Sequence, residues 1–155
     1  MRMTRQKLIF LAVGLLFAIL PGVAAWAGAQ DPEVVALAPL KDGTLYENPQ
    51  GTIANGAGDY LFAGLRNNGA ARRGLVAFDI AGSIPEGSEI TDAVLTLNLS
   101  RVAAGIEGGF PIHLERVARD WGEGASDAGE PGGAGTLAVE GDATWIHTFY
   151  NSENW

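Results

Sequence analysis

The sequence predicts an all-β fold in which short antiparallel strands form a sandwich. The clearest sign is a strand whose alternate residues are apolar and share one face: Ala93, Leu95, Leu97 and Leu99. A shorter strand precedes it, and the link at residues 84–88 contains Pro85 and Gly87, which favour a turn. No stretch beyond residue 30 shows sustained helical periodicity, so short strands separated by turns are the expected pattern.

Turn-forming residues divide the rest of the chain into short elements. We expect, in order, an extended leader at residues 30–40, a turn at 41–43, a strand at 44–47, a loop at 48–58, a strand at 59–65, a turn at 66–71, strands at 72–80 and 90–100, a loop at 102–109, a strand at 110–119 with a bulge near Glu115, a glycine-rich loop at 122–135, a short strand at 136–139, and a segment at 143–150 that packs Trp145.

The first 29 residues have the pattern of a secretory signal peptide. Basic residues precede the apolar run Leu8–Leu20, and the small residues Ala27, Gly28 and Ala29 offer a cleavage site. The alternative is a membrane anchor, but this run is shorter than the roughly 20 residues that span a bilayer. We therefore expect a signal-peptide helix at 1–29 that is removed, a leader at 30–40 and a domain at 41–155.

The chain beyond the expected signal is strongly acidic. All 18 acidic residues and seven of the ten basic residues follow residue 30, which gives that part a formal charge of −11. Such a surface repels phosphate backbones, so nucleic acid is not an expected partner. Polyanions are disfavoured for the same reason unless arginines or cations intervene locally. The chain has no cysteine, so an exported domain would depend on its core, on bound metal or on a larger assembly.

Several segments together resemble the DNRLRE-type domain. The central match carries paired arginines, a Phe-Asp-Ile strand end and the Ile-Pro-x-Gly link, and comprises Arg72, Arg73, Leu75, Val76, Phe78, Asp79, Ile80, Ile84, Pro85, Gly87, Ile90, Ala93, Leu95, Leu97 and Leu99. Residues 114–117, 120–124 and 141–145 are similar to later segments of the family, and residues 45–47 and 55–56 are similar to its opening. The resemblance covers about residues 40–155.

This resemblance implies a secreted, jelly-roll-like β-sandwich without catalytic residues, and some relatives are classed as modules that bind acidic polysaccharides. In the family the segment around Trp155 leads to further strands, so we expect a domain that is incomplete at its C-terminus or completed by another chain.

The aromatic residues and arginines are candidates for binding sugar. Carbohydrate modules stack aromatic rings on pyranose faces, and an exposed arginine can hold a uronate carboxylate through two hydrogen bonds. The candidates are Arg72, Arg73, Trp121, Trp145, Tyr150 and Trp155. The alternative is structural: the tryptophans close the ends of the sandwich, and the arginines, which lie on opposite faces of a strand, form ion pairs.

Carboxylates in and near the glycine-rich loop are candidates for calcium binding or for hydrolysis. A glycine-rich loop exposes carbonyl oxygens, and Ca²⁺ takes carboxylate and carbonyl ligands. The calcium candidates are Asp120, Glu123, Asp127 and Asp142, with Asp42, Asp59 and Asp79 as alternatives, and Glu130 joins the loop acids as a possible member of a catalytic pair. The alternative is that these acids are solvated loop charges. The only histidines, His113 and His147, have no third histidine or cysteine with which to form a zinc site.

The function predicted from the sequence is a non-catalytic extracellular module that binds polysaccharide or serves as a structural domain at the cell surface. One alternative is an adhesive or structural domain whose partner is a protein, such as another cell-surface domain. A second is a fragment of a polysaccharide-degrading enzyme. After signal cleavage no membrane contact is expected.

Overall fold

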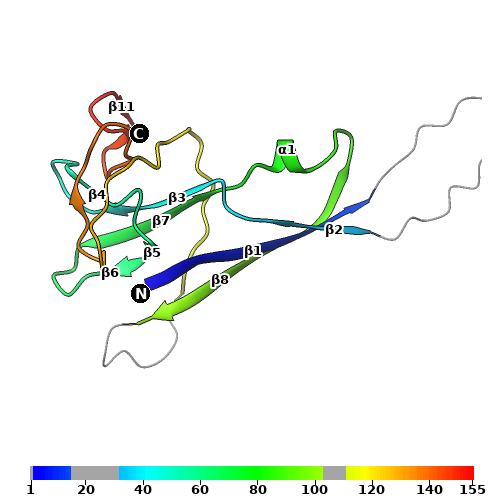
Figure 1. The fold of residues 1–155 in the computed structure, drawn as a ribbon, viewed down its shortest axis with the longest axis horizontal. Coiled ribbons are helices and arrows are strands. Elements are labelled where there is room, and N and C mark those ends of the chain that lie inside the picture. Colours follow the sequence, from blue (N-terminus) through cyan, green and yellow to red (C-terminus); the bar gives the residue numbers. More distant parts are fainter. Residues whose placement is uncertain (1, 15–31, 103–110) are drawn as a thin grey trace, which may run out of the picture. The chain divides into compact units, whose positions relative to one another are not determined.

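A computed structural model describes residues 2–14, 32–102 and 111–155 (Figure 1). The all-β class predicted from the sequence is confirmed, because one short helix accompanies the strands among these residues. The elements are β1 (Arg2–Gly14), β2 (Glu33–Leu37), β3 (Lys41–Tyr46), β4 (Ile53–Ala54), β5 (Tyr60–Phe62), β6 (Gly64–Leu65), β7 (Ala71–Ala77), α1 (Ile80–Ser83), β8 (Glu89–Arg101), β9 (Thr136–Leu137), β10 (His147–Phe149) and β11 (Glu153–Asn154). No helix in the described ranges has the length and apolar character needed to cross a membrane.

The chain divides into two compact units, each described by itself. Unit 1 takes residues 1–5, 41–77 and 98–155, and unit 2 takes residues 6–40 and 78–97.

The central sheet of unit 1 has the order β3-β7-β6. Strand β3 pairs antiparallel with β7 over six positions, from Lys41 opposite Ala77 to Tyr46 opposite Arg72. Strand β6 pairs with the other edge of β7, and the amide of Gly69 closes the intervening turn on the Arg66 carbonyl. The turn predicted at residues 66–71 is therefore confirmed, although its last residue already belongs to β7.

The hydrophobic core of unit 1 forms around this sheet. Leu45, Leu75, Trp121 and Ala143 are buried together, and Trp145 packs against them. Leu45 comes from β3 and Leu75 from β7, whereas the other three come from segments 120–145, which have little regular structure. Fully burying side chains of the size of leucine contributes about 1.5–3 kcal/mol each, so the core fixes the irregular segments to the sheet.

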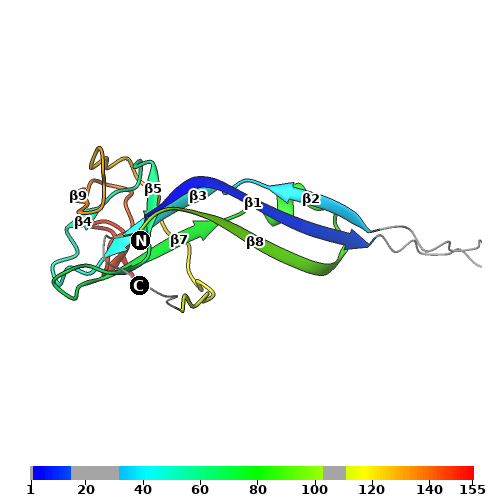
Figure 2. The same cartoon turned by 90° about the horizontal axis from the view of Figure 1, so that it is seen from below.

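Within unit 2, β1 pairs with two strands. Its residues Ile9–Val13 pair antiparallel with β2, with Ile9 opposite Leu37 and Val13 opposite Glu33. Strand β8 also pairs with β1, and Figure 2 shows β1 running between β2 and β8.

Strand β8 confirms the most regular prediction from the sequence. Its 13 residues include the whole alternating stretch. Leu95 and Leu97 are half-buried, whereas Leu99 is 51% exposed, so the apolar face is covered only in its middle.

Helix α1 replaces the end of the expected strand at residues 72–80. The Asp79 carboxylate accepts a hydrogen bond from the Gly82 amide at 2.8 Å, and the Ile84 amide donates to the Ile80 carbonyl. An aspartate that accepts from the third residue after it is a helix N-cap, so this side chain turns the backbone out of the strand. The prediction that Ile80 continues the strand was wrong for this reason.

Residues Arg2–Gly14 were expected to begin a signal-peptide helix, and the structure has them as strand β1 instead. Pairing with the edges of β2, β5 and β8 satisfies backbone groups that those strands would otherwise leave open. The apolar residues of this run are also compatible with a strand. The rest of the expected signal, including Ala27–Ala29, lies outside the described residues.

Further segments differ from the sequence prediction. The strand expected at residues 59–65 is divided into β5 and β6, and the loop expected at 48–58 contains β4. The expected turn at residues 41–43 is the first half of β3. The strand expected at residues 110–119 is not formed over 111–119, since residues 111–118 are exposed and have no strand partner, and Phe110 lies outside the described residues. No bulge at Glu115 is therefore present, and most of the loop expected at 102–109 lies outside the described residues.

Candidate functional site

Trp121, a candidate for stacking on sugar, is buried in the core and only 3% exposed. The Lys41 ammonium lies 4.7 Å from the centre of its ring and donates hydrogen bonds to the Trp121 carbonyl and to the Asp120 carboxylate. The hydrogen bond from Lys41 lowers the pKa of Asp120 below its usual value, because it favours the ionised carboxylate. These contacts give Trp121 and Asp120 structural roles.

Asp142, a candidate metal ligand, is completely buried and binds backbone amides. Its Oδ2 accepts from the Val139 amide at 2.6 Å, and its Oδ1 accepts from the Ser126 amide at 3.3 Å. A Cβ atom on Gly124, which has a φ of +70°, would lie 1.8 Å from the same Oδ1. Asp142 thus organises the loop by closing on its backbone, and glycine is required where the backbone comes closest.

The other two calcium candidates also contact backbone. Glu123 Oε1 accepts from the Asp42 amide at 3.1 Å, and Asp127 Oδ1 accepts from the Gly129 amide at 2.8 Å. In the part of the chain that the structure describes, no three side chains of His, Cys, Asp or Glu are grouped as metal ligands. The structure therefore does not bring the four calcium candidates together as one site.

Arg72 packs inward from β7. Its guanidinium lies 5.2 Å from the centre of the Phe62 ring, and Nη1 donates to the Gly133 carbonyl at 3.0 Å. Burial lowers the pKa of Arg72, because desolvation disfavours its charge. The Tyr46 hydroxyl donates to the neighbouring Gly132 carbonyl at 2.9 Å, so Arg72 and Tyr46 together hold the glycine-rich loop.

Arg73 is exposed and contacts different groups from those of Arg72. Its guanidinium lies 4.7 Å from the centre of the Trp145 ring. Trp145 is half-buried and packs against the core, so the core residues fix the position of its ring. The pair combines an exposed cation with an aromatic ring that restricts its motion.

Tyr150 and Trp155 pack near the hairpin of β10 and β11. The half-buried Tyr150 ring meets the His147 ring edge-on, with centroids 5.3 Å apart. Trp155 Nε1 donates to the Thr144 carbonyl at 2.8 Å, and its residue is 38% exposed. These contacts favour packing roles for both aromatic residues.

Sequence reasoning missed two residues that shape this region, Lys41 and the buried Asn55, whereas the packing role expected for Tyr46 agrees with its burial. Asn55 Oδ1 accepts from the Ala128 amide at 2.8 Å and thereby ties a turn to the glycine-rich loop. Asn55 and Gly56 signalled only a turn, because a contact across 73 residues leaves no periodic trace in a sequence. The sequence predicts a turn at Lys41, whereas the structure has this residue at the start of β3.

Comparisons with protein-family models, with curated proteins and with solved structures find no match for this chain.

Proposed function

We propose that the chain is exported, that residues 1–29 are removed, and that the remaining jelly-roll-like domain is a non-catalytic module that binds an acidic polysaccharide. The resemblance to the DNRLRE-type domain supports export, the jelly-roll architecture and the class of ligand. The observation that carries the proposal is the exposed Arg73 guanidinium above the Trp145 ring.

The geometry of this pair favours a carboxylate over a neutral sugar. Trp145 packs on the core with Arg73 over its ring, so the group offered to solvent is the guanidinium. A planar guanidinium binds a carboxylate through two parallel hydrogen bonds, and a uronate sugar carries one carboxylate on each ring. Stacking on Trp145 reduces the conformational entropy that Arg73 loses when it binds.

The loop carboxylates support a role without catalysis. Asp142, Glu123 and Asp127 accept hydrogen bonds from backbone amides, which assigns them to folding the loop. A glycosidase requires two carboxyl groups that face each other across a cleft.

Affinity electrophoresis of the exported protein in gels with a uronate polymer or a neutral glucan tests this proposal. We expect retardation by the uronate polymer alone and a loss of about tenfold or more in affinity for Arg73→Ala, the effect of removing a charged hydrogen-bonded contact. Arg73→Lys keeps the charge but loses the two-pronged geometry, and should restore binding only in part.

Arg101→Ala is the matched control, because it removes the same charge from an exposed position on β8. Equal losses of affinity for the uronate polymer in Arg73→Ala and Arg101→Ala would show that the polymer is attracted by charge alone. No retardation by either polymer would favour the second candidate, a structural domain that binds protein. The apolar residues exposed on β8, Ile90, Val94 and Leu99, support that candidate.

A further inference from the structure

The place that β1 takes in unit 2 is a strand position within a sheet. Five residues of β1 pair with β2 in continuous register, from Ile9 opposite Leu37 to Val13 opposite Glu33, and β8 also pairs with β1. We call the space between β2 and β8 the strand slot (Figure 2). If residues 1–29 are removed, as proposed above, the backbone groups that β2 and β8 direct at β1 lose their partner.

The flanking strands define which kind of segment fits the slot. On β2, Val34 is 58% exposed, whereas Val35 is half-buried and Leu37 is buried. On β8, Val94 is 46% exposed, whereas Leu95 and Leu97 are half-buried. One face of this sheet is therefore exposed to solvent and the other is covered, so a strand of alternating apolar and polar residues suits the slot.

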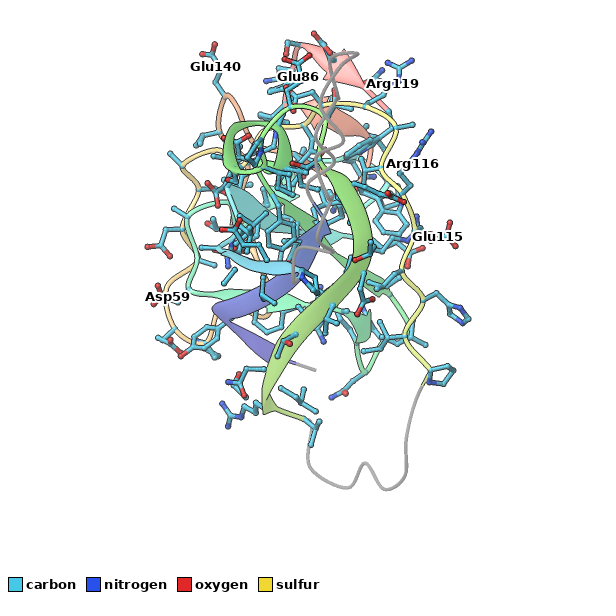
Figure 3. The ribbon with its side chains drawn as sticks, turned by 90° about the vertical axis from the view of Figure 1, so that its right-hand side faces the viewer. Asp59, Glu86, Glu115, Arg116, Arg119 and Glu140 are labelled. Atoms are coloured by element: carbon cyan, nitrogen blue, oxygen red, sulfur yellow. The ribbon has the colours of Figure 1, made fainter. Side chains whose placement is uncertain are left out.

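The chain itself carries such a segment without a strand partner. Residues 111–118 are exposed and pair with no strand, and their apolar side chains Ile112 and Leu114 are 49% and 72% exposed. Glu115 and Arg116 extend outward from this segment, as does Arg119, which follows it (Figure 3). An exposed segment of this kind is a ready donor for pairing with an open strand edge.

One charge pair links the donor to the slot. The donor segment carries one acid, Glu115, and one base, Arg116, and a donor antiparallel to β2 with Leu114 opposite Val35 places Arg116 opposite the exposed Glu33. Opposite charges on adjacent strands favour pairing, whereas like charges on adjacent strands disfavour it.

We propose that in the processed protein the strand slot of one copy accepts residues 111–118 of a second copy. This inference rests on the proposed removal of residues 1–29. With the donor antiparallel to β2 and its apolar side chains on the covered face, Leu114 lies opposite Val35 and Ile112 opposite Leu37. Each copy then offers both a donor and a slot, so association is head-to-tail.

The test begins with the intact mass of the exported protein, which shows whether residues 1–29 have been removed. Light scattering after size exclusion, over a range of concentrations, then measures assembly. We expect a mass of at least two copies that rises with concentration, and a return to the single-copy mass when a peptide of residues 4–14 is added. The same peptide with Leu11→Pro should leave the assembly intact, because proline lacks the amide for the ladder.

Cysteine cross-linking tests the register, and the absence of native cysteines makes the result unambiguous. Two separately purified variants, Val35→Cys and Leu114→Cys, are mixed and oxidised. Residues directly opposite each other lie within disulfide range, so the two variants should form a covalent heterodimer. His113→Cys is the control for Leu114→Cys, because its side chain lies on the other face of the donor.

Retention of residues 1–14 would overturn the inference, because the chain then fills its own slot. A single-copy mass at every concentration would also overturn it, as would cross-linking of His113→Cys that is as efficient as that of Leu114→Cys. Co-purification of a different protein that the peptide displaces would also overturn it, because the occupant is then another chain. Loss of uronate binding alone affects only the proposed function, because Arg73 and Trp145 belong to unit 1.

Discussion

Asp142→Ala tests whether a single buried carboxylate holds the glycine-rich loop in its fold. The substitution removes both acceptors from a fully buried position and leaves the amides of Val139 and Ser126 without this partner. Hydrogen bonds to charged groups contribute about 1.5–3 kcal/mol each, and the Ser126 contact is the weaker because it is longer. We expect the free energy of unfolding to fall by about 3–5 kcal/mol.

Asp142→Asn separates the charge from the shape. An asparagine can still accept one hydrogen bond, but its amide nitrogen must then face an N–H donor, so we expect a loss of about 1.5–3 kcal/mol. Asp127→Asn is the matched control in the same loop. Asp127 is exposed and its oxygen accepts from Gly129, a contact that an asparagine oxygen retains, so the change should stay within about 0.5 kcal/mol.

Urea unfolding followed by tryptophan fluorescence is a suitable assay, because Trp121 and Trp145 lie in or against the core that the loop completes. If Asp142→Ala costs no more than Asp127→Asn, the loop does not depend on this carboxylate. If chelating calcium removes the difference in the free energy of unfolding between the wild type and Asp142→Ala, Asp142 would instead be a ligand for calcium.

Three further substitutions test other contacts. Lys41→Met should destabilise the protein at neutral pH. Because the pKa of Asp120 is lowered in the folded state, the ion pair of Lys41 and Asp120 stabilises the fold above the usual aspartate pKa, and this stabilisation is lost as pH falls through the folded pKa. The difference in Tm between the wild type and Lys41→Met should therefore narrow in acid. Burial raises the pKa of Tyr46 to about 12, so wild-type stability should fall by about 2–3 kcal/mol between pH 10 and 12, and the fall should be absent in Tyr46→Phe, as alkaline unfolding curves would show. Gly135→Ala should cost about 2 kcal/mol or more in urea unfolding, because φ is +72° and the new Cβ would lie 2.5 Å from Ile53; an unchanged midpoint would contradict this reading.

Periodicity allowed much of the fold to be predicted from the sequence. The alternation that identifies β8 is local, and the sequence Asn67-Asn68-Gly69 marks a turn because of the backbone conformations it favours. Helix α1 was missed although its signal was present, since Asp79 followed three residues later by Gly82 is compatible with a cap. The apolar alternation from Ile112 to Leu114 predicts a strand, but a strand also needs a neighbour, which sequence patterns do not supply.

The candidate site was less predictable because its residues act across long separations. Arg72 and Arg73 were recognised as facing opposite ways, and their partners Phe62 and Trp145 differ accordingly. Which arginine stays exposed depends on where the segment around Trp145 packs, and that segment joins the core through contacts about 70 residues away from β7. The sequence indicates only the charge of Asp142, whereas its buried place among amides depends on how the loop closes.

The local use of charge is compatible with the acidic ligand proposed for this acidic chain. Lys41, Arg72 and Arg73 each lie against an aromatic ring, but their charges are balanced differently. Lys41 is paired with the carboxylate of Asp120, and Arg72 donates to a loop carbonyl at a partly buried position. The ring beneath Arg73 restricts its motion without neutralising it, so its charge remains directed at solvent. At physiological salt, charges beyond about 8 Å are screened, so a carboxylate at Arg73 would respond chiefly to that guanidinium and only weakly to the net charge of the chain.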